Sequence, residues 1–562
     1  MRWLRTSSAL LLIGMALTLS ACGGNSNSDS SAASAVDTDP PEVQLGERLF
    51  LETRFAEFFF ANFNGDVNAP LASGDPVMNT SQTTGVPLPG PFVGQSMNCR
   101  GCHLVDELQD ESGGGVRTYC DFARRSPVPQ TNDGLVTTPR NSPPLVNATL
   151  TRGVPTLLHF DGEFASLHDL IIGTMTGRNF GWAPNQAATA ISHIANVIRN
   201  DDGSNDLAKS FGGGGVPFSE LLLGTNPRIP RRLRIPAAFR IDVSSATDQQ
   251  IIEDVAALIG AYVDSLRFAT DDDGFYIASP YDVFLKKNGL PRGPNPGETE
   301  LAYSQRLLGL VSQISAPVFV TPKDGKFKFH QDQKFQFGAI ELEGLKIFFK
   351  QPANPGDEHS GNCVACHTPP NFTDFQLHNT GASQLEYDAI FGSGAFAALS
   401  IPSIAVRNAD FDLYLPPSAN HPGANSRFRS PASLSDPGNA DLGVWNIVGN
   451  PDIPAPQQAI MDILCTQFQL TGAACNADAL LPLAIAYFKT PTLRDLGQSN
   501  PYLHNGSLTS VDDVVTFYVT TSRLAQQHQL RNAAPELSNM FIDQSDVAAL
   551  SAFLNALNED YN

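Results

Sequence analysis

The feature that most constrains this chain is a five-residue pattern, Cys-x-x-Cys-His, which occurs at residues 99–103 and again at 363–367. Two thiols at this spacing can reach the two vinyl groups of one haem, and the histidine next in sequence can then ligate the iron from the proximal side. The pattern therefore predicts two covalently bound haems of the c type. The predicted attachment and proximal-ligand residues are Cys99, Cys102, His103, Cys363, Cys366 and His367.

Other uses of paired cysteines fit this pattern less well. A structural zinc site needs four ligands, and neither copy has a second Cys or His pair at zinc-ribbon spacing. A thioredoxin-like motif would be expected within a βαβ unit and in one copy. Among the remaining cysteines, Cys465 and Cys475 are close enough in sequence to form a disulfide across a short loop. Cys120 is then left over and is assigned no function.

The N-terminus has the pattern of an export signal. Arg2 and Arg5 precede an apolar run over 9–19 that is too short to span a bilayer as a mature helix. The run ends in Leu-Ser-Ala-Cys22, which is similar to a bacterial lipobox and implies lipidation of Cys22. The alternative is an ordinary signal peptide with a chance cysteine. Residues 23–40, rich in Ser, Gly, Asn and Asp, predict a flexible tether. We therefore expect an exported, lipid-anchored protein, on the outer membrane facing the periplasm or at the cell surface.

The charge of the chain limits its partners. A formal net charge of −21 argues against nucleic acid and against anionic membrane surfaces, so membrane contact is expected only through the lipid anchor. The acidity would suit a basic redox partner, although a merely solvated acidic surface is the alternative. A basic run lies within a predicted insertion over 200–240 and is interpreted as a solvated loop. Its residues are Arg228, Arg231, Arg232 and Arg234.

The chain repeats its own order of segments. Gly-x-x-x-Phe segments at 46–50 and 344–348 precede the two motifs, and Asp-Val-Ala-Ala-Leu opens an amphipathic stretch at 254–258 and at 546–550. This predicts a mainly α fold with long loops, made by tandem duplication of a cytochrome c-like haem domain whose first and last helices pack together. The predicted parts are a signal peptide (1–22), the tether (23–40), a first haem domain (41–268), a connector rich in Gly and Pro turns (269–335) and a second haem domain (336–562).

These segments resemble the bacterial di-haem cytochrome c peroxidase and MauG family over most of 42–562, more specifically in the second half. The resemblance implies that peroxide or oxygen reacts at the N-terminal haem. It also implies that the C-terminal haem passes electrons to or from a small redox protein. The matching pieces are 45–50, 140–143, 145–148 and 161–162 in the first half, and 361–367, 370–375, 378–379, 488–494, 501–508 and 514–515 in the second.

The resemblance also implies a calcium ion between the domains, held by an asparagine side chain and by backbone oxygens next to a Pro-Tyr pair. Asn141, Ser499 and Pro501 occupy the matching positions, and Ser499 stands where a threonine is usual. Oxygen donors of this kind suit calcium. The alternative for Asn141 is an ordinary turn residue.

The resemblance sets expectations for the second ligand of each iron. Residues 121–141 contain no histidine, whereas resting peroxidases of the family often carry one there, so the N-terminal haem resembles the open, five-coordinate MauG branch. Above the C-terminal haem the family has Met or, in MauG, Tyr. Counting forward from Pro501 places Tyr518 at this position, and a phenolate would stabilise ferric iron. Met540 and Met461 are the alternative ligands.

The expected distal pocket of the N-terminal haem departs from the family. A Trp-Asp-Gly-Arg motif reads Phe160-Asp-Gly-Glu163 here, and the family's Gln and Glu positions fall on Leu170 and Phe180. An apolar pocket would make peroxide cleavage slow. It also resembles the rubber oxygenases, which bind oxygen and cleave an isoprenoid double bond. The tryptophan thought to relay electrons between haems is replaced by Phe160, and Trp182 is either a substitute for it or a core residue.

Three functions therefore remain in view. The first is a peroxidase-family enzyme, which needs an acid–base group near the first haem, an effect worth about 10²–10⁴ in rate. The candidates for that group are His168, Asp169 and Glu163. The second is a haem dioxygenase acting on an apolar substrate, and the third is a non-catalytic electron-transfer lipoprotein.

Overall fold

A computed structural model of the 562-residue chain describes residues 39–559, except 81, 84–85, 88–93, 104–127, 132, 151–152, 210–214, 326–333 and 355. The predicted signal peptide, its Cys22, most of the predicted tether and Cys120 lie outside the described residues. Within the described part, no helix is both long and apolar enough to cross a membrane. The chain is mainly α-helical with few strands, as predicted.

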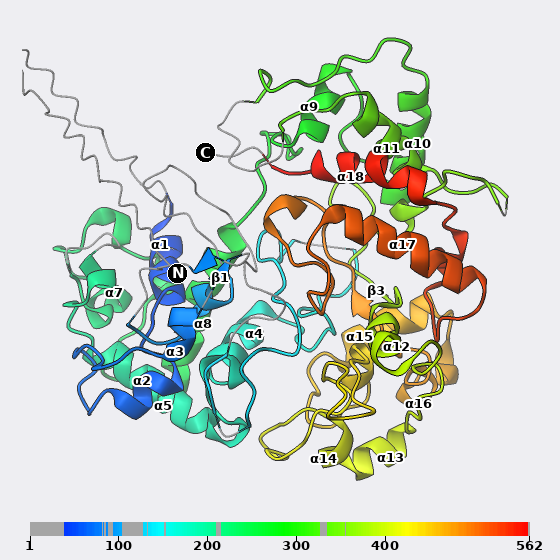
Figure 1. The fold of residues 1–562 in the computed structure, drawn as a ribbon. Helices are drawn as coiled ribbons and strands as arrows, with labels where there is room; N and C mark the ends of the chain where they lie inside the picture. The colour runs from blue at the N-terminus through cyan, green and yellow to red at the C-terminus, as the bar shows by residue number, and fades with distance from the viewer. Residues whose placement is uncertain are drawn as a thin grey trace, which may run out of the picture. The chain divides into compact units, whose positions relative to one another are not determined.

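The first half forms around one pair of helices. Helix α1 (Pro41–Phe50) packs on α8 (Asp248–Ser265), and α4 (Leu167–Met175) and α5 (Ala187–Asn200) also pack on α8 (Figure 1). The Thr247 side chain begins α8 by accepting a hydrogen bond from the Gln250 backbone N–H, and the Gln250 side chain returns to Thr247. The apolar faces of these helices form a single core.

The second half repeats this arrangement. Helix α11 (Ala339–Phe349) packs on α18 (Val547–Asn555), and α17 (Val511–Gln526) also packs against α18 (Figure 1). Both first helices precede a haem motif, and both last helices close their half. The predicted pairing of first and last helices in each half is therefore confirmed.

A glycine marks each crossing point. A Cβ atom added at Gly46 would collide with the carbonyl of Leu258, and one added at Gly344 would collide with the carbonyl of Ala549. The two crossings thus have the same construction. Leu258 is the fifth residue of its Asp-Val-Ala-Ala-Leu segment, whereas Ala549 is the fourth residue of the other copy. The residues that occupy the same place in the two helix crossings are therefore offset by one position from the residues that match in sequence.

The connector predicted over 269–335 contains helices as well as turns. Helix α9 (Pro280–Lys287) begins at a capping box formed by Ser279 and Asp282, and α10 (Glu300–Ser312) begins at the side-chain cap of Thr299. Apolar side chains of both helices join the core that contains α11 and α18. This segment therefore contributes to the second half's core.

A separate apolar cluster lies mostly within the second half and also includes Leu157 of the first half. We call residues 382–487, which supply most of it, the insertion. Its base is closed by a two-stranded antiparallel ladder of β3 (Leu377–His378) and β4 (Phe488–Lys489). The predicted Cys465–Cys475 disulfide lies in it and is confirmed. Its helices, grouped at the lower right of Figure 1, are α12 (Ala382–Phe391), α13 (Ile404–Ala409), α14 (Phe411–Tyr414), α15 (Gln457–Gln467) and α16 (Ala477–Leu480).

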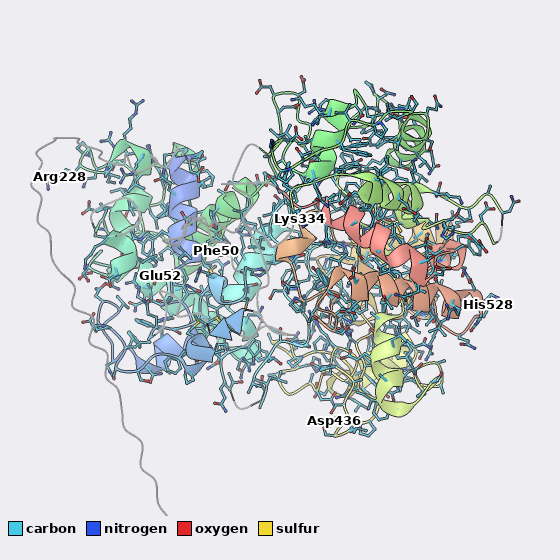
Figure 2. All side chains as sticks on the ribbon, turned by 45° about the horizontal axis from the view of Figure 1, so that its top comes forward. Phe50, Glu52, Arg228, Lys334, Asp436 and His528 are labelled. Atoms are coloured by element: carbon cyan, nitrogen blue, oxygen red, sulfur yellow. A yellow bond between two sulfur atoms is a disulfide. The ribbon has the colours of Figure 1, made fainter. Side chains whose placement is uncertain are left out.

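The other described elements are short. They are α2 (Glu57–Asn62), α3 (Pro76–Thr80), α6 (Asp206–Ala208) and α7 (Phe218–Leu223), with a two-stranded antiparallel pair β1 (Gln82–Thr83) and β2 (Val86–Pro87). The arginines of the basic run that follows α7 are exposed, and Arg228 lies at the margin of the first half in Figure 2. Its interpretation as a solvated loop stays a prediction.

Candidate functional site

The two Cys-x-x-Cys-His motifs adopt the same local structure. Each begins with a single 3₁₀ turn, Cys99–Gly101 in the first half and Cys363–Ala365 in the second. The backbone N–H of His103 donates to the Cys99 carbonyl at 2.9 Å, and that of His367 donates to the Cys363 carbonyl at 2.8 Å. None of the four motif cysteines takes part in a disulfide. The turn therefore places both cysteines of each motif beside its histidine.

The His367 imidazole is held as an iron ligand would be. Its Nδ1–H donates to the Phe372 carbonyl at 3.0 Å, which leaves Nε2 as the free lone pair. Burial lowers the pKa of His367, although the carbonyls of Phe372 and Pro491 raise it. The ring is therefore neutral and oriented.

The His103 imidazole has a related setting. Burial lowers the pKa of His103 to about 4, with a further lowering by the charge of His159, while the Pro143 carbonyl raises it. Its Nδ1 is buried with no hydrogen-bond partner among the described residues. Pro143 stands in the first half where Pro491 stands in the second, so both histidines face a proline carbonyl.

A mainly apolar cavity of about 220 Å³ surrounds the second motif. Cys363, Cys366 and His367 line it, together with Tyr518 and Met540. Burial raises the pKa of Tyr518. Two of the three predicted candidates for the second iron ligand thus line the cavity.

The third candidate, Met461, packs against the separate apolar cluster of the insertion instead. A covalently bound haem requires a pair of thiols, an imidazole beside them and an apolar cavity. The second motif has all three, so its residues fit the group, and the first motif supplies the thiols and the imidazole.

The residues predicted to bind calcium come together at one edge of this cavity. Asn141, Ser499 and Pro501 all line it. The Asn141 side-chain amide contacts the Pro501 carbonyl, and its backbone N–H donates to the His504 carbonyl at 2.7 Å. An asparagine amide offers an oxygen when turned over, so this set can supply the oxygen donors that calcium prefers.

The segment at residues 159–160 lies against both motif sites. The His159 ring is near enough to His103 to lower its pKa, and Phe160 lines the cavity around the second motif. The Phe160 carbonyl accepts a hydrogen bond from the Lys489 N–H at 2.7 Å. Sequence reasoning selected Phe160 but missed His159, whose only signal was its position next to Phe160.

A buried group of charges, which we call the arginine–carboxylate cluster, joins the first half to the insertion. Arg140 contacts Asp161 at 2.5 Å and Asp441 at 2.6 Å, and Arg429 contacts Glu163 at 2.5 Å and Asp161 at 3.5 Å. Burial raises the pKa of Asp441, but the charge of Arg140 outweighs it and holds that pKa at about 2. Arg429 likewise holds the pKa of Glu163 well below its usual value, against the effect of burial.

The distal candidates are spread over the first core. Phe180 is buried and Leu170 half-buried on α4. The His168 side chain is 42% exposed, and its Nε2 lies 3.3 Å from the Glu253 carbonyl on α8. The backbone N–H of Asp169 donates to the Ser166 side chain, which caps the start of α4. Trp182 is fully buried and donates to the Phe55 carbonyl, as a core residue does.

Comparison with known proteins gives partial sequence matches. No family model matches the chain. Cytochrome-c peroxidase IdrP2 of Denitromonas iodatirespirans is 27% identical over 197 residues, 35% of this chain and 36% of the relative. Cytochrome-c peroxidase IdrP1 of the same organism is 49% identical over 37 residues, 7% of this chain and 10% of the relative. The chain thus matches about a third or less of the length of these curated relatives.

Two solved structures are similar over most of the chain at low scores. The di-haem peroxidase BthA from Burkholderia thailandensis E264 has a TM-score of 0.39 and 16% identity, covering 93% of this chain and 86% of that one. A MauG-like protein associated with microbial copper homeostasis has a TM-score of 0.41 and 15% identity, covering 93% and 90%.

Proposed function

We propose, from the premise that this chain belongs to the di-haem cytochrome c peroxidase and MauG family, that it is an oxidoreductase that reduces hydrogen peroxide or uses it to oxidise a partner. Two covalent haems c, one at each motif, are part of this proposal. The observation that carries it is the repeated setting of His103 and His367, each a neutral imidazole at the end of a 3₁₀ turn that carries two cysteines outside any disulfide. The sequence match to cytochrome-c peroxidases supports the same reading.

The haems supply the redox chemistry, and the side chains of this chain bind, orient and insulate them. Reduction of one peroxide to two waters consumes two electrons and two protons. We assign the electrons to a small redox protein that delivers them at the second motif. Their route to the first motif runs past Phe160 and His159, the segment next to both sites.

Proton delivery depends on side chains outside the arginine–carboxylate cluster. Glu163 is held as a carboxylate by Arg429, so it accepts a proton poorly and has none to donate near neutral pH. His168 and Asp169 remain as acid–base candidates, and both are on the solvent side of α4. We therefore expect peroxide turnover to be slow compared with an enzyme that carries a buried distal carboxylate.

A haem dioxygenase acting on an apolar substrate is the second candidate. The apolar side chains at Leu170 and Phe180, where the family carries Gln and Glu, favour it. A product containing both atoms of O₂, formed without peroxide, would select this function over the first.

Three further assignments belong to the proposal. Calcium would be held by Asn141 with backbone oxygens of Ser499 and Pro501, supported by the contact between the Asn141 amide and the Pro501 carbonyl. Tyr518, which lines the cavity, would supply the second ligand to the iron of a haem at the second motif. Export and lipidation at Cys22, with anchoring on the outer membrane, follow from the lipobox-like sequence alone.

The test is to mix the purified holoprotein with hydrogen peroxide and a reduced small cytochrome, recording absorbance and electron spin resonance. We expect steady oxidation of the cytochrome and a high-spin signal from the first-motif iron. His103→Gly should abolish turnover, whereas the matched change His528→Gly, at an exposed residue away from both motifs, should leave it unchanged. Two low-spin irons inert to peroxide in every redox state would reject catalysis and leave an electron carrier.

A further inference from the structure

The insertion presents a pair of opposite charges from adjoining positions. Arg429 and Asp441 face each other across an isolated antiparallel β-bridge. The Arg429 N–H donates to the Ser426 carbonyl at 2.9 Å, and the Asp441 carboxylate accepts from the Gly443 N–H at 2.9 Å. The backbone of Arg429 and the side chain of Asp441 are therefore both held within the insertion.

The first half supplies Arg140 and Glu163, which pair with Asp441 and Arg429 respectively. Arg140 makes two hydrogen bonds to the Asp441 carboxylate, at 2.6 and 2.7 Å, and Arg429 makes two to the Glu163 carboxylate, at 2.5 and 3.1 Å. Asp161 completes the ring between the two arginines. All five side chains are at most 20% exposed. Buried charges are costly unless paired, so only one placement of the insertion satisfies all of them.

The cluster is not well suited to a cation. His159, Asp161 and Glu163 offer ligand atoms within 4.8 Å of one another. Arg140 and Arg429 already pair with Asp161, Glu163 and Asp441, and a metal ion would have to displace both guanidiniums. The charges are better explained as a set of ion pairs that join the first half to the insertion.

Two of the three residues held from the first half, Arg140 and Asp161, belong to loops that contribute to both motif sites. Arg140 immediately precedes Asn141, which contacts the Pro501 carbonyl, and lies three residues before Pro143, whose carbonyl faces His103. Asp161 immediately follows Phe160, which lines the cavity around the second motif. Any shift of these two loops would move groups beside both histidines.

We propose that Arg429 and Asp441 are positioning residues: a clamp in the insertion that sets the loops carrying Asn141 and Phe160, and so sets the electronic contact between the two haem sites. The clamp touches neither motif directly and acts through Arg140 and Asp161. This inference rests on the proposed function only in assuming a haem at each motif.

The test compares three variants of the full-length holoprotein. Asp441→Asn removes the charge with almost no change of shape, and Asp441→Glu restores it. The control is Arg407→Gln, because Arg407 is buried within the insertion and donates to the Trp445 and Val448 carbonyls without contacting the first half. The control thus weakens the insertion but leaves the clamp in place.

The readouts do not depend on peroxide turnover. They are the ferric electron spin resonance signal of the first-motif iron and the rate at which one injected electron redistributes between the two haems. We expect Asp441→Asn to change the signal and slow redistribution roughly 2- to 30-fold, the range for residues that couple distant sites. Asp441→Glu should recover at least half of that loss.

Arg407→Gln should lower the unfolding temperature yet leave both readouts unchanged. The inference is overturned if Asp441→Asn behaves as wild type, or if Arg407→Gln reproduces its effect at an equal loss of stability. If Asp441→Asn does not fold, Arg429→Lys, which keeps the charge but loses the paired hydrogen bonds, takes its place with the same expectations. A wild type that fails to turn over peroxide would reject the proposed function while leaving these readouts intact.

Discussion

The close helix crossing at Gly344 predicts that replacing this glycine by alanine lowers the stability of the protein. An alanine Cβ at Gly344 would meet the Ala549 carbonyl and the Phe553 Cβ, both on α18. Because the obstacle is backbone rather than a flexible side chain, α11 and α18 must move apart. Overpacking of this kind costs about 1–3 kcal/mol, occasionally more.

Alanine also has a higher helix propensity than glycine, so the variant needs a control in which only this gain occurs. Gly309 lies in the exposed face of α10 with nothing within 4 Å of an added Cβ. Replacing it by alanine should stabilise the protein by roughly 0.5–1 kcal/mol, since Gly is that much poorer than Ala in a helix. We expect Gly344→Ala to fall below wild type and to lie about 1–3 kcal/mol below Gly309→Ala, because the gain in helix propensity is common to both variants and cancels.

The assay is urea unfolding of each holoprotein, followed by far-ultraviolet circular dichroism and by haem absorbance. The two probes separate loss of the second half from global unfolding. The reasoning is refuted if Gly344→Ala unfolds at or above the urea midpoint of Gly309→Ala, because the helix crossing would then not be as close as described.

Three other changes have defined outcomes. Replacing Cys465 and Cys475 by alanine removes a cross-link between residues ten apart in sequence and should cost roughly 3 kcal/mol by loop entropy, measured as a lower urea midpoint that reductant no longer changes. The folded pKa of Asp441, about 2, lies below its ordinary 3.8, so its stabilising contribution is complete above pH 3.8 and is lost as pH falls toward 2. Asp441→Asn should therefore flatten the decline of the unfolding midpoint between pH 4 and 2, and an unchanged decline would contradict the buried ion pair. Tyr518→Met should raise the reduction potential of one haem, whereas Met540→Leu should leave it unchanged, and the reverse result would make Met540 the ligand.

The sequence predicted the repeated parts of this fold because each repeat has a local cause. The motif spacing is fixed by haem geometry, and Gly46 and Gly344 stand where two helices cross too closely for a Cβ. Even so, the five-residue identity at 254–258 and 546–550 is one residue out of structural step. Sequence identity located the closing helices but did not set the register of their crossing.

The connector was only partly predictable. Its Gly and Pro content indicates turns. The Ser279-Pro-x-Asp282 capping pattern, by contrast, is a local signal for the start of a helix. Short helices such as α9 depend on packing against the rest of a core, and that packing is not visible in local composition.

The arginine–carboxylate cluster could not be predicted at all. Its members Arg140 and Asp441 are separated by 301 residues, and each alone looks like an ordinary surface charge. Only the folded chain shows that both are buried and paired. His159 could not be predicted for the same reason. It is distinguished by its closeness to His103 and Glu163 in the fold and not by any sequence pattern.

The central claim is that each motif bonds one haem through two thioethers, with the adjoining histidine on the iron. The most direct measurement is the intact mass of the mature protein, isolated from cells competent in cytochrome maturation, after acid–acetone extraction. We predict a mass that exceeds the polypeptide by two haems, falling to one haem in Cys363→Ser/Cys366→Ser. A colourless protein, or a mass equal to the bare polypeptide, would contradict the account.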